Sequence, residues 1–215
     1  MKVLMVMAHP DDEILFGYPI FQYKDIEKKV LICSSDFYNE ERTWCKYRKE
    51  ALFEICNDMD VEVECLDYPS SFYKTQSRPP KDLPKNTEES DSQAPLRKMC
   101  QDIVDRMLEL EKDYDYVFTH NPYGEYGHFD HRLLFDLVLK NTTKPVLITD
   151  IMIKSNWGFN TTISDNMKKV YYNNIFKENC ILDKDLFNYC KNKYISKNGW
   201  TWSGSISESC NLFLI

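Results

Sequence analysis

The chain has 215 residues, and its 27 Lys and Arg against 34 Asp and Glu give a formal net charge of −7. This length fits one compact domain, and a hydrophobic content of 43% argues against disorder. The acidic balance disfavours a nucleic-acid partner, which would require clustered basic residues. No apolar run reaches the ~20 residues that a membrane span needs, and residues 3–8 are too short for an export signal. We therefore expect a cytoplasmic protein without an integral membrane segment; the sequence does not indicate its oligomeric state.

The 8 cysteines include no Cys-x-x-Cys pair, and several lie within apolar patterns. Free cysteine in such a pattern behaves as a small hydrophobic residue. Without an export signal, reduced and buried thiols are favoured over a disulfide framework.

Short apolar runs alternate with helical periodicity along the first 150 residues. The runs predict buried strands at 2–8, 29–34, 116–119 and 145–149, and a weaker, alternating strand at 61–66. Apolar residues at helical spacing predict helices in the regions 44–56, 96–108 and 133–138. Strands that alternate with helices are typical of a mostly parallel sheet covered on both faces. The sequence therefore predicts an α/β fold, a Rossmann-like three-layer sandwich.

The regular alternation fades in the last part of the chain, which predicts a less regular C-terminal portion. We expect residues 1–150 to form the core and residues 151–215 to be an extension that completes the same domain. Residues 152–153 and 170–172 are candidate edge strands, and 176–195 contain a plausible helix. The stretch from 69 to 95 lacks periodicity and is expected to be a long loop.

All 4 histidines lie just beyond the carboxyl end of a predicted strand. His9 follows the first strand, and His120, His128 and His131 follow the strand at 116–119. Open parallel sheets bind their ligands at the carboxyl ends of the strands. The sequence therefore places the candidate site at this edge of the sheet.

The residue types around these histidines suit a divalent metal. Asp11 and Asp12 are neighbours on one tight turn, so one carboxylate can bind a cation while the other stays free as a base. His128 and His131 are three residues apart, which points both toward one side of a helical turn. Two histidines and one carboxylate suit Zn²⁺ with an open position for water, although Fe²⁺ or another first-row divalent ion would also bind. Taken alone, an Asp-Asp-Glu run is more often a helix N-cap.

Two motifs resemble those of the zinc-dependent N-acetylglucosaminyl deacetylase family. Residues 8–13, Ala-His-Pro-Asp-Asp-Glu, match its first motif residue for residue. Residues 127–131, Gly-His-Phe-Asp-His, resemble the second, with Phe129 where proline is commoner, and Gly-Glu-Tyr at 124–126 also fits. This family includes the glycosylphosphatidylinositol-pathway deacetylase and enzymes that deacetylate glucosaminyl-inositol or glucosaminyl-malate. The resemblance covers about residues 1–150.

The resemblance implies the metal ligands and the base. His9, Asp12 and His131 would hold the metal. Asp11 would be the general base that takes a proton from the metal-activated water.

The resemblance also implies roles for residues that touch the substrate. His128 would stabilise the oxyanion and help to protonate the leaving amine, while Asp130 would orient and charge its ring. Tyr126 would donate to the carbonyl oxygen. Arg48 resembles a substrate-binding arginine only loosely, because its offset from Glu50 differs by one residue.

The resemblance therefore implies a metal-dependent hydrolase that removes an N-acetyl group from a small-molecule amino sugar or its conjugate. An amidase acting on another acyl amide, such as a thiol conjugate, is the alternative closest in chemistry. A non-catalytic sugar-binding module is a weaker alternative. A nucleotide-binding Rossmann domain is disfavoured because no glycine-rich phosphate loop occurs. Trp157, Trp200 and Trp202 could stack on sugar rings, although each is more simply explained as a core residue.

Overall fold

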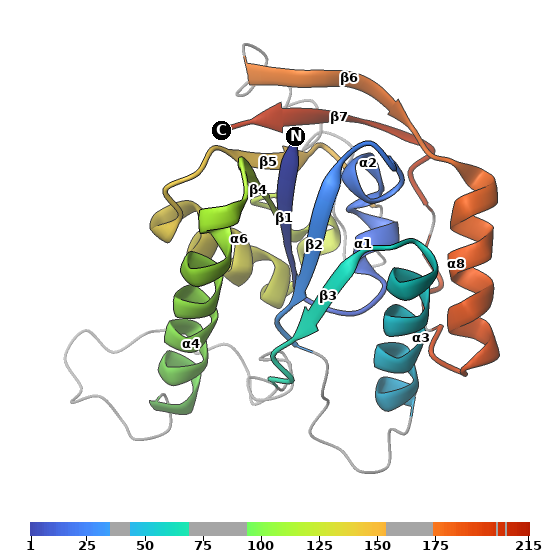
Figure 1. Ribbon diagram of the computed structural model, residues 1–215, viewed down its shortest axis with the longest axis horizontal. Helices are drawn as coiled ribbons and strands as arrows, with labels where there is room; N and C mark the ends of the chain where they lie inside the picture. Colours follow the sequence, from blue (N-terminus) through green and yellow to red (C-terminus); the bar gives the residue numbers. More distant parts are fainter. Residues whose placement is uncertain (35–43, 69–93, 154–173, 201, 205) are drawn as a thin grey trace.

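A single mixed sheet organises the protein, as seen in the computed structural model (Figure 1). The structure describes residues 1–34, 44–68, 94–153, 174–200, 202–204 and 206–215. The described strands form a 7-stranded sheet of order β3-β2-β1-β4-β5-β7-β6. Their bounds are Lys2–Met7 (β1), Glu27–Ile32 (β2), Glu62–Cys65 (β3), Tyr116–Phe118 (β4), Val146–Thr149 (β5), Ile175–Ile181 (β6) and Ser209–Leu214 (β7). Neighbours from β3 to β5 are parallel, whereas β7 runs antiparallel to both β5 and β6.

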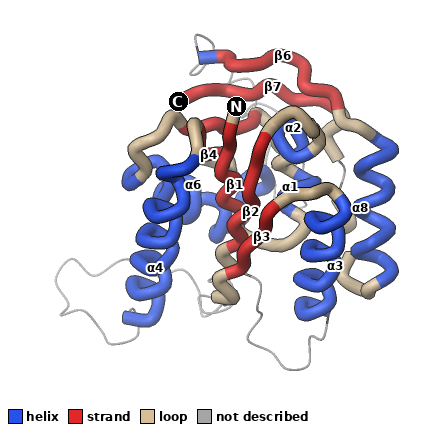
Figure 2. Tube along the Cα trace, in the orientation of Figure 1, coloured by secondary structure: helices blue, strands red, loops and turns tan. Residues whose placement is uncertain are grey.

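Helices cover both faces of this sheet (Figure 2). Helices α4 and α6 lie on one side, and α3 and α8 lie on the other. The helical bounds are Asp12–Leu15 (α1), Tyr18–Phe21 (α2), Trp44–Asp58 (α3), Ala94–Leu110 (α4), Glu111–Asp113 (the 3-10 helix η3), Gly124–Gly127 (α5), Phe129–Asn141 (α6) and Lys184–Ser196 (α8).

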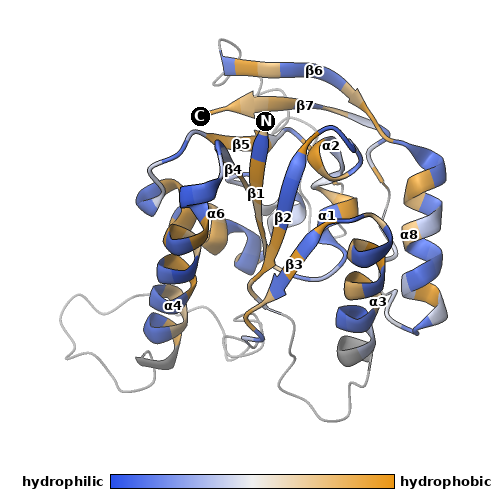
Figure 3. Ribbon diagram, in the orientation of Figure 1, coloured by the Kyte–Doolittle hydropathy of each residue, from blue (hydrophilic) through white to orange (hydrophobic). Residues whose placement is uncertain are grey.

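Strand β1 connects the two halves of the core. Met5 and Met7 face the cluster formed with α1, α2, α3 and α8, whereas Leu4 and Val6 face the cluster formed with α4 and α6. Side chains alternate in this way because successive residues of a strand point to opposite faces. Both faces are covered, which explains the continuous apolar run of β1 (Figure 3).

The structure confirms the predicted α/β sandwich with a mostly parallel sheet. The five predicted strands correspond to β1 to β5, and the three predicted helices to α3, α4 and α6, with ends that differ by a few residues. None of the described helices has the length and apolar character that a membrane crossing requires. Seven cysteines of the described region are free thiols, and five of these are buried.

The helix predicted within residues 176–195 is present as α8, but the first part of that range forms β6, which was not predicted. This strand lies at the sheet edge with most side chains exposed, and two register shifts interrupt its pairing, so it lacks the alternation of a half-buried strand. Residues 152–153 are not in a strand, and β7 was not predicted. The candidate strand at 170–172 and residues 69–93 of the expected loop lie outside the described residues.

Candidate active site and metal centre

The first part of the site is the turn that leaves β1. The backbone N–H of His9 donates to Asp12 Oδ2 at 2.8 Å, which ties the turn to the first residue of α1. Asp11 lies between them with a φ of 91°, in the left-handed region that a non-glycine residue rarely adopts. Asp11 and Asp12 are both buried. The turn therefore holds two carboxylates away from bulk water at the end of a parallel strand.

The second part is the loop that leaves β4, the neighbour of β1 in the sheet. Gly124 and Gly127 have positive φ values of 63° and 91°, which allow the chain to turn sharply before α6. His128 is the N-cap of α6, and its Nδ1 accepts the backbone N–H of Asp130 at 3.2 Å. His131 follows in the first turn of the helix and is fully buried.

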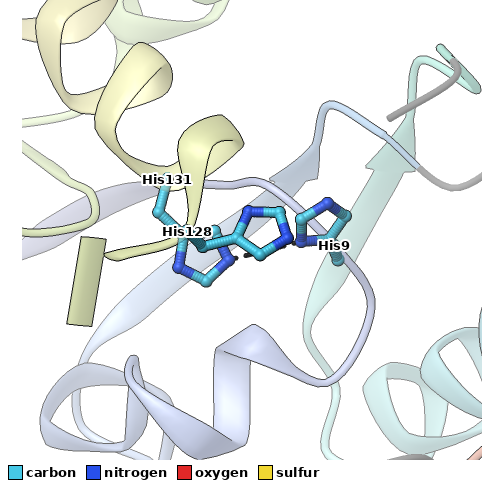
Figure 4. Close-up of side chains that lie close together, drawn as sticks. All are labelled: His9, His128 and His131. Atoms are coloured by element: carbon cyan, nitrogen blue, oxygen red, sulfur yellow. Dashed lines mark hydrogen bonds between the residues drawn. The ribbon is translucent and has the colours of Figure 1, made fainter. Parts of the chain in front are cut away.

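The predicted metal ligands lie close together. His131 Nε2 lies 3.3 Å from His9 Nδ1, and Asp12 Oδ2 lies 3.4 Å from each of these two nitrogens. A tetrahedral zinc ion with bonds of about 2.0–2.1 Å holds its ligand atoms about 3.3–3.4 Å apart. These three atoms therefore have the spacing that a tetrahedral ion requires. His128 lies beside them, because potential ligand atoms of His9, His128 and His131 are all within 4.8 Å of one another (Figure 4).

The hydrogen bonds on the far side of each imidazole support a ligand role. His9 Nε2 contacts Asp130 Oδ2 at 3.1 Å, and His131 Nδ1 contacts Glu125 Oε2 at 2.7 Å. Each ring thus turns its other nitrogen toward Asp12. Carboxylates behind metal-binding histidines are the usual partners of such sites.

Buried charges give this centre unusual proton affinities. Burial alone would raise the pKa of Asp12, but the imidazoles of His131, His120 and His9 hold it well below its usual value. Burial likewise opposes the charged form of His9, yet hydrogen bonds to Asp12 and Asp130 raise its pKa to about 9. A metal bound between these groups would displace a proton from His9.

Asp11 faces a different partner from Asp12. Its Oδ1 pairs with Arg48 Nη2, and the same nitrogen donates to the carbonyl of Pro10 at 2.6 Å. Burial raises the pKa of Asp11 to about 6, against the opposing charge of Arg48. The predicted substrate-binding arginine is therefore buried and lies against the predicted base.

A second buried carboxyl holds the backbone of Asp11. Glu13 Oε2 accepts the N–H of Asp11 at 2.9 Å, and Glu13 Oε1 accepts the hydroxyl of Tyr194 at 2.6 Å. Tyr194 comes from α8, in the part of the chain that resembles no known motif. Sequence reasoning missed this residue, because nothing in its local pattern separates it from an ordinary core tyrosine.

His128 and Tyr126 line the same centre. The ring of His128 lies 4.8 Å from that of His9, and the ring of Tyr126 lies 5.6 Å from His128. Burial and the neighbouring His131 and His9 lower the pKa of His128 to about 2, which favours the neutral imidazole.

Trp200 and Trp202 lie in two different environments. Trp202 packs on Tyr126 with ring centroids 5.2 Å apart, at the site, whereas Trp200 packs on Phe187 and Tyr194 in the core. Trp157 lies outside the described residues.

Two further site residues were not assigned from the sequence. His120 follows β4, stacks on His131 with centroids 3.9 Å apart, and lies 3.4 Å from Asp12 Oδ2 through Nε2. Glu125 lies behind both rings. The strand-end position of His120 and the motif position of Glu125 were visible signals, but the contacts of Glu125 with the two rings exist only in the folded loop.

Comparison with known proteins identifies the family. Residues 4–141 match the family described as GlcNAc-PI de-N-acetylase. An uncharacterised protein, L374, of Acanthamoeba polyphaga mimivirus is 26% identical over 151 residues, which are 62% of this chain and 56% of that protein. This chain thus matches little more than half the length of that relative.

Solved structures share the fold at low identity. The zinc inhibited form of teicoplanin deacetylase Orf2 superposes with a TM-score of 0.60 at 14% identity, covering 100% of this chain and 99% of that one. N,N'-diacetylchitobiose deacetylase from Pyrococcus horikoshii superposes with a TM-score of 0.51 at 14% identity, covering 94% and 71% of the two chains. The family match extends over most of the chain and includes both motifs of the site, and the protein therefore belongs to the GlcNAc-PI de-N-acetylase family.

Proposed function

We propose that this protein is a divalent metal-dependent hydrolase that removes the N-acetyl group from an N-acetylated amino sugar or its conjugate. The observation that carries the proposal is the convergence of His9, Asp12 and His131 at tetrahedral spacing, with Asp11 on the adjoining residue of the same turn. Family membership supplies the reaction class.

His9, Asp12 and His131 would hold the metal, for which Zn²⁺ is the first candidate and Fe²⁺ or another first-row ion the alternative. When bound, such an ion polarises an amide carbonyl and lowers the pKa of water. The zinc inhibited form of teicoplanin deacetylase Orf2 supports zinc as a candidate ion, although zinc is inhibitory in that protein.

Asp11 is the proposed general base. Its pKa of about 6 makes it a better proton acceptor than an ordinary aspartate, while it still ionises near neutral pH. In the proposed reaction, water adds to the amide carbon as its proton passes to Asp11. The carbon–nitrogen bond then breaks and the same proton passes to the leaving amine. The second proton of the water stays on the added oxygen, so acetic acid and a free amine are formed.

His128 is the proposed donor to the developing oxyanion. Because its Nδ1 accepts the backbone N–H of Asp130, its ring proton lies on Nε2, from which it would be donated. The sequence suggested an imidazolium in this role, but the lowered pKa favours donation from the neutral ring. Tyr126 would add a second donor, and losing one donor of this kind costs on the order of 10²–10³ in rate.

The substrate is proposed from chemistry at the rim of the site. Trp202 packs on Tyr126, so an apolar ring lies next to the proposed oxyanion donors and could contact the C–H face of a sugar. The named deacetylases among the structural neighbours support an amino-sugar conjugate. The role of Arg48 in binding substrate stays a prediction.

The test is release of free amine from a panel of N-acetylglucosamine conjugates and other acyl amides by the zinc-loaded full chain. We expect turnover on the sugars, with no turnover by Asp11→Asn at equal metal content. His128→Ala should lower the rate and keep the metal. Turnover only on acyl amides without a sugar would favour the amidase alternative, and metal binding without any turnover would favour the binding module.

A further inference from the structure

Both carboxylate oxygens of Glu125 have partners in the site, although neither proposed catalysis nor metal ligation uses this residue. It is fully buried. Its Oε2 contacts Nδ1 of His131 at 2.7 Å and Nδ1 of His120 at 3.1 Å, and its Oε1 accepts the backbone N–H of Asn121 at 3.0 Å. One side chain thereby connects two stacked imidazoles to the loop that leaves β4.

These contacts fix where the ring protons lie. The Nε2 of His120 accepts the backbone N–H of Ala8 at 3.0 Å, which leaves its proton on Nδ1, facing Glu125. The same carboxylate oxygen draws the proton of His131 to Nδ1. The Nε2 of His131 is then a free acceptor, directed toward His9 Nδ1 and Asp12 Oδ2.

The backbone of Glu125 adopts an unfavourable conformation where its side chain makes these contacts. Its φ of 54° and ψ of −49° lie outside the regions that side-chain-bearing residues normally occupy. Its carbonyl accepts the N–H of Ile153 at 2.9 Å, and its own N–H donates to Asn121 Oδ1 at 3.3 Å. Strained residues of this kind persist where the surrounding structure over-determines them, often at functional sites.

We propose that Glu125 is a positioning residue of the metal centre, which sets the tautomer and ring orientation of His131 so that Nε2 can bind the ion. His120 anchors Glu125 to the end of β1 through Ala8. This inference rests on the proposed function, since it takes His131 as a metal ligand. Removing an outer partner of a metal-binding histidine commonly lowers metal affinity 10–100-fold.

The test measures metal affinity directly on the chelator-stripped full chain, by Co²⁺ absorption spectra and competition with Zn²⁺. Glu125→Gln keeps the size of the side chain but places an amide NH₂ against one of the donors. We expect its Co²⁺ and Zn²⁺ affinities to fall about 10–100-fold, with an altered Co²⁺ spectrum.

Glu111→Gln is the matched control. Glu111 is also a buried glutamate that accepts several hydrogen bonds, but its partners are Thr142 and Thr143 beyond α6. The Glu111→Gln variant should be less stable in urea, with unchanged metal affinity and an unchanged Co²⁺ spectrum. Glu125→Asp should recover part of the lost affinity, because it restores a carboxylate.

The outcomes separate this inference from the proposed function. If the wild-type chain binds metal and Glu125→Gln binds it within about two-fold as tightly, the positioning role is refuted and the metal-dependent function stands. If Glu111→Gln loses as much affinity as Glu125→Gln, the effect is a general loss of stability and the inference is also refuted. If the wild-type chain binds neither ion, the proposed metal dependence fails and takes this inference with it.

Discussion

The hydrogen bond between Tyr194 and Glu13 allows a sharp test of how the C-terminal helix supports the site. Both residues are fully buried, and the hydroxyl donates to Glu13 Oε1 at 2.6 Å. Tyr194→Phe removes one oxygen and leaves a buried carboxyl oxygen without this donor. Such a loss costs about 1–3 kcal/mol, so the free energy of unfolding should fall by that amount in urea titrations followed by circular dichroism.

The same helix supplies the control. Tyr189 also donates its hydroxyl to a carboxylate, that of Asp58, but this residue is 41% exposed. Water can replace this hydrogen bond, so Tyr189→Phe should change the free energy of unfolding by no more than about 0.5 kcal/mol. Equal losses in the two variants, or no loss in Tyr194→Phe, would refute the reasoning that burial decides the cost.

Three further predictions concern the site. His131→Ala should lose both metal and turnover, whereas Asp11→Ala should lose turnover and keep metal by elemental analysis; equal metal loss would contradict the role of Asp11 as base. Burial raises the pKa of Glu13 from 4.5 to about 8, so the folded state keeps a proton that the unfolded state has released, and stability falls as pH rises between these values. In unfolding titrations across that pH range, Glu13→Gln should reduce the slope of the free energy of unfolding against pH by up to roughly 1.4 kcal/mol per pH unit. An unchanged slope would show that Glu13 does not cause the pH dependence. A Cβ at Gly199 would lie 3.0 Å from the backbone of Arg48. Gly199→Ala should therefore lower the free energy of unfolding by about 1–3 kcal/mol in urea titrations, and it should also lower kcat. Wild-type values of both quantities would contradict this packing.

Strands β1 to β5 and the helices α3, α4 and α6 were predictable from local patterns, whereas the short helices α1, α2, η3 and α5 were not predicted. Strand β1 is buried on both faces and is therefore apolar throughout, and α4 shows a clear apolar face. Strand β6 makes no such signal. It is an exposed edge strand, and it has too few buried side chains to produce an apolar run or an alternation of apolar and polar residues.

The resemblance of two motifs to a known family likewise implied His9, Asp12 and His131 as a set, and the structure brings these three residues together. The contacts of Tyr194 with Glu13 and of Glu125 with His120 could not be predicted in the same way. They join residues through hydrogen bonds whose geometry exists only after the loops and α8 pack together.

The left-handed backbone of Asp11 opposes stability to the proposed role of this residue as the base. The β-carbon of Asp11 costs roughly 1 kcal/mol of stability in this conformation. Glycine would remove that cost, but it would also remove the carboxylate. Directed evolution for heat tolerance alone would thus tend to enrich glycine here and select variants that lack the proposed base. Screening for product formation would then keep the aspartate in spite of the weaker fold.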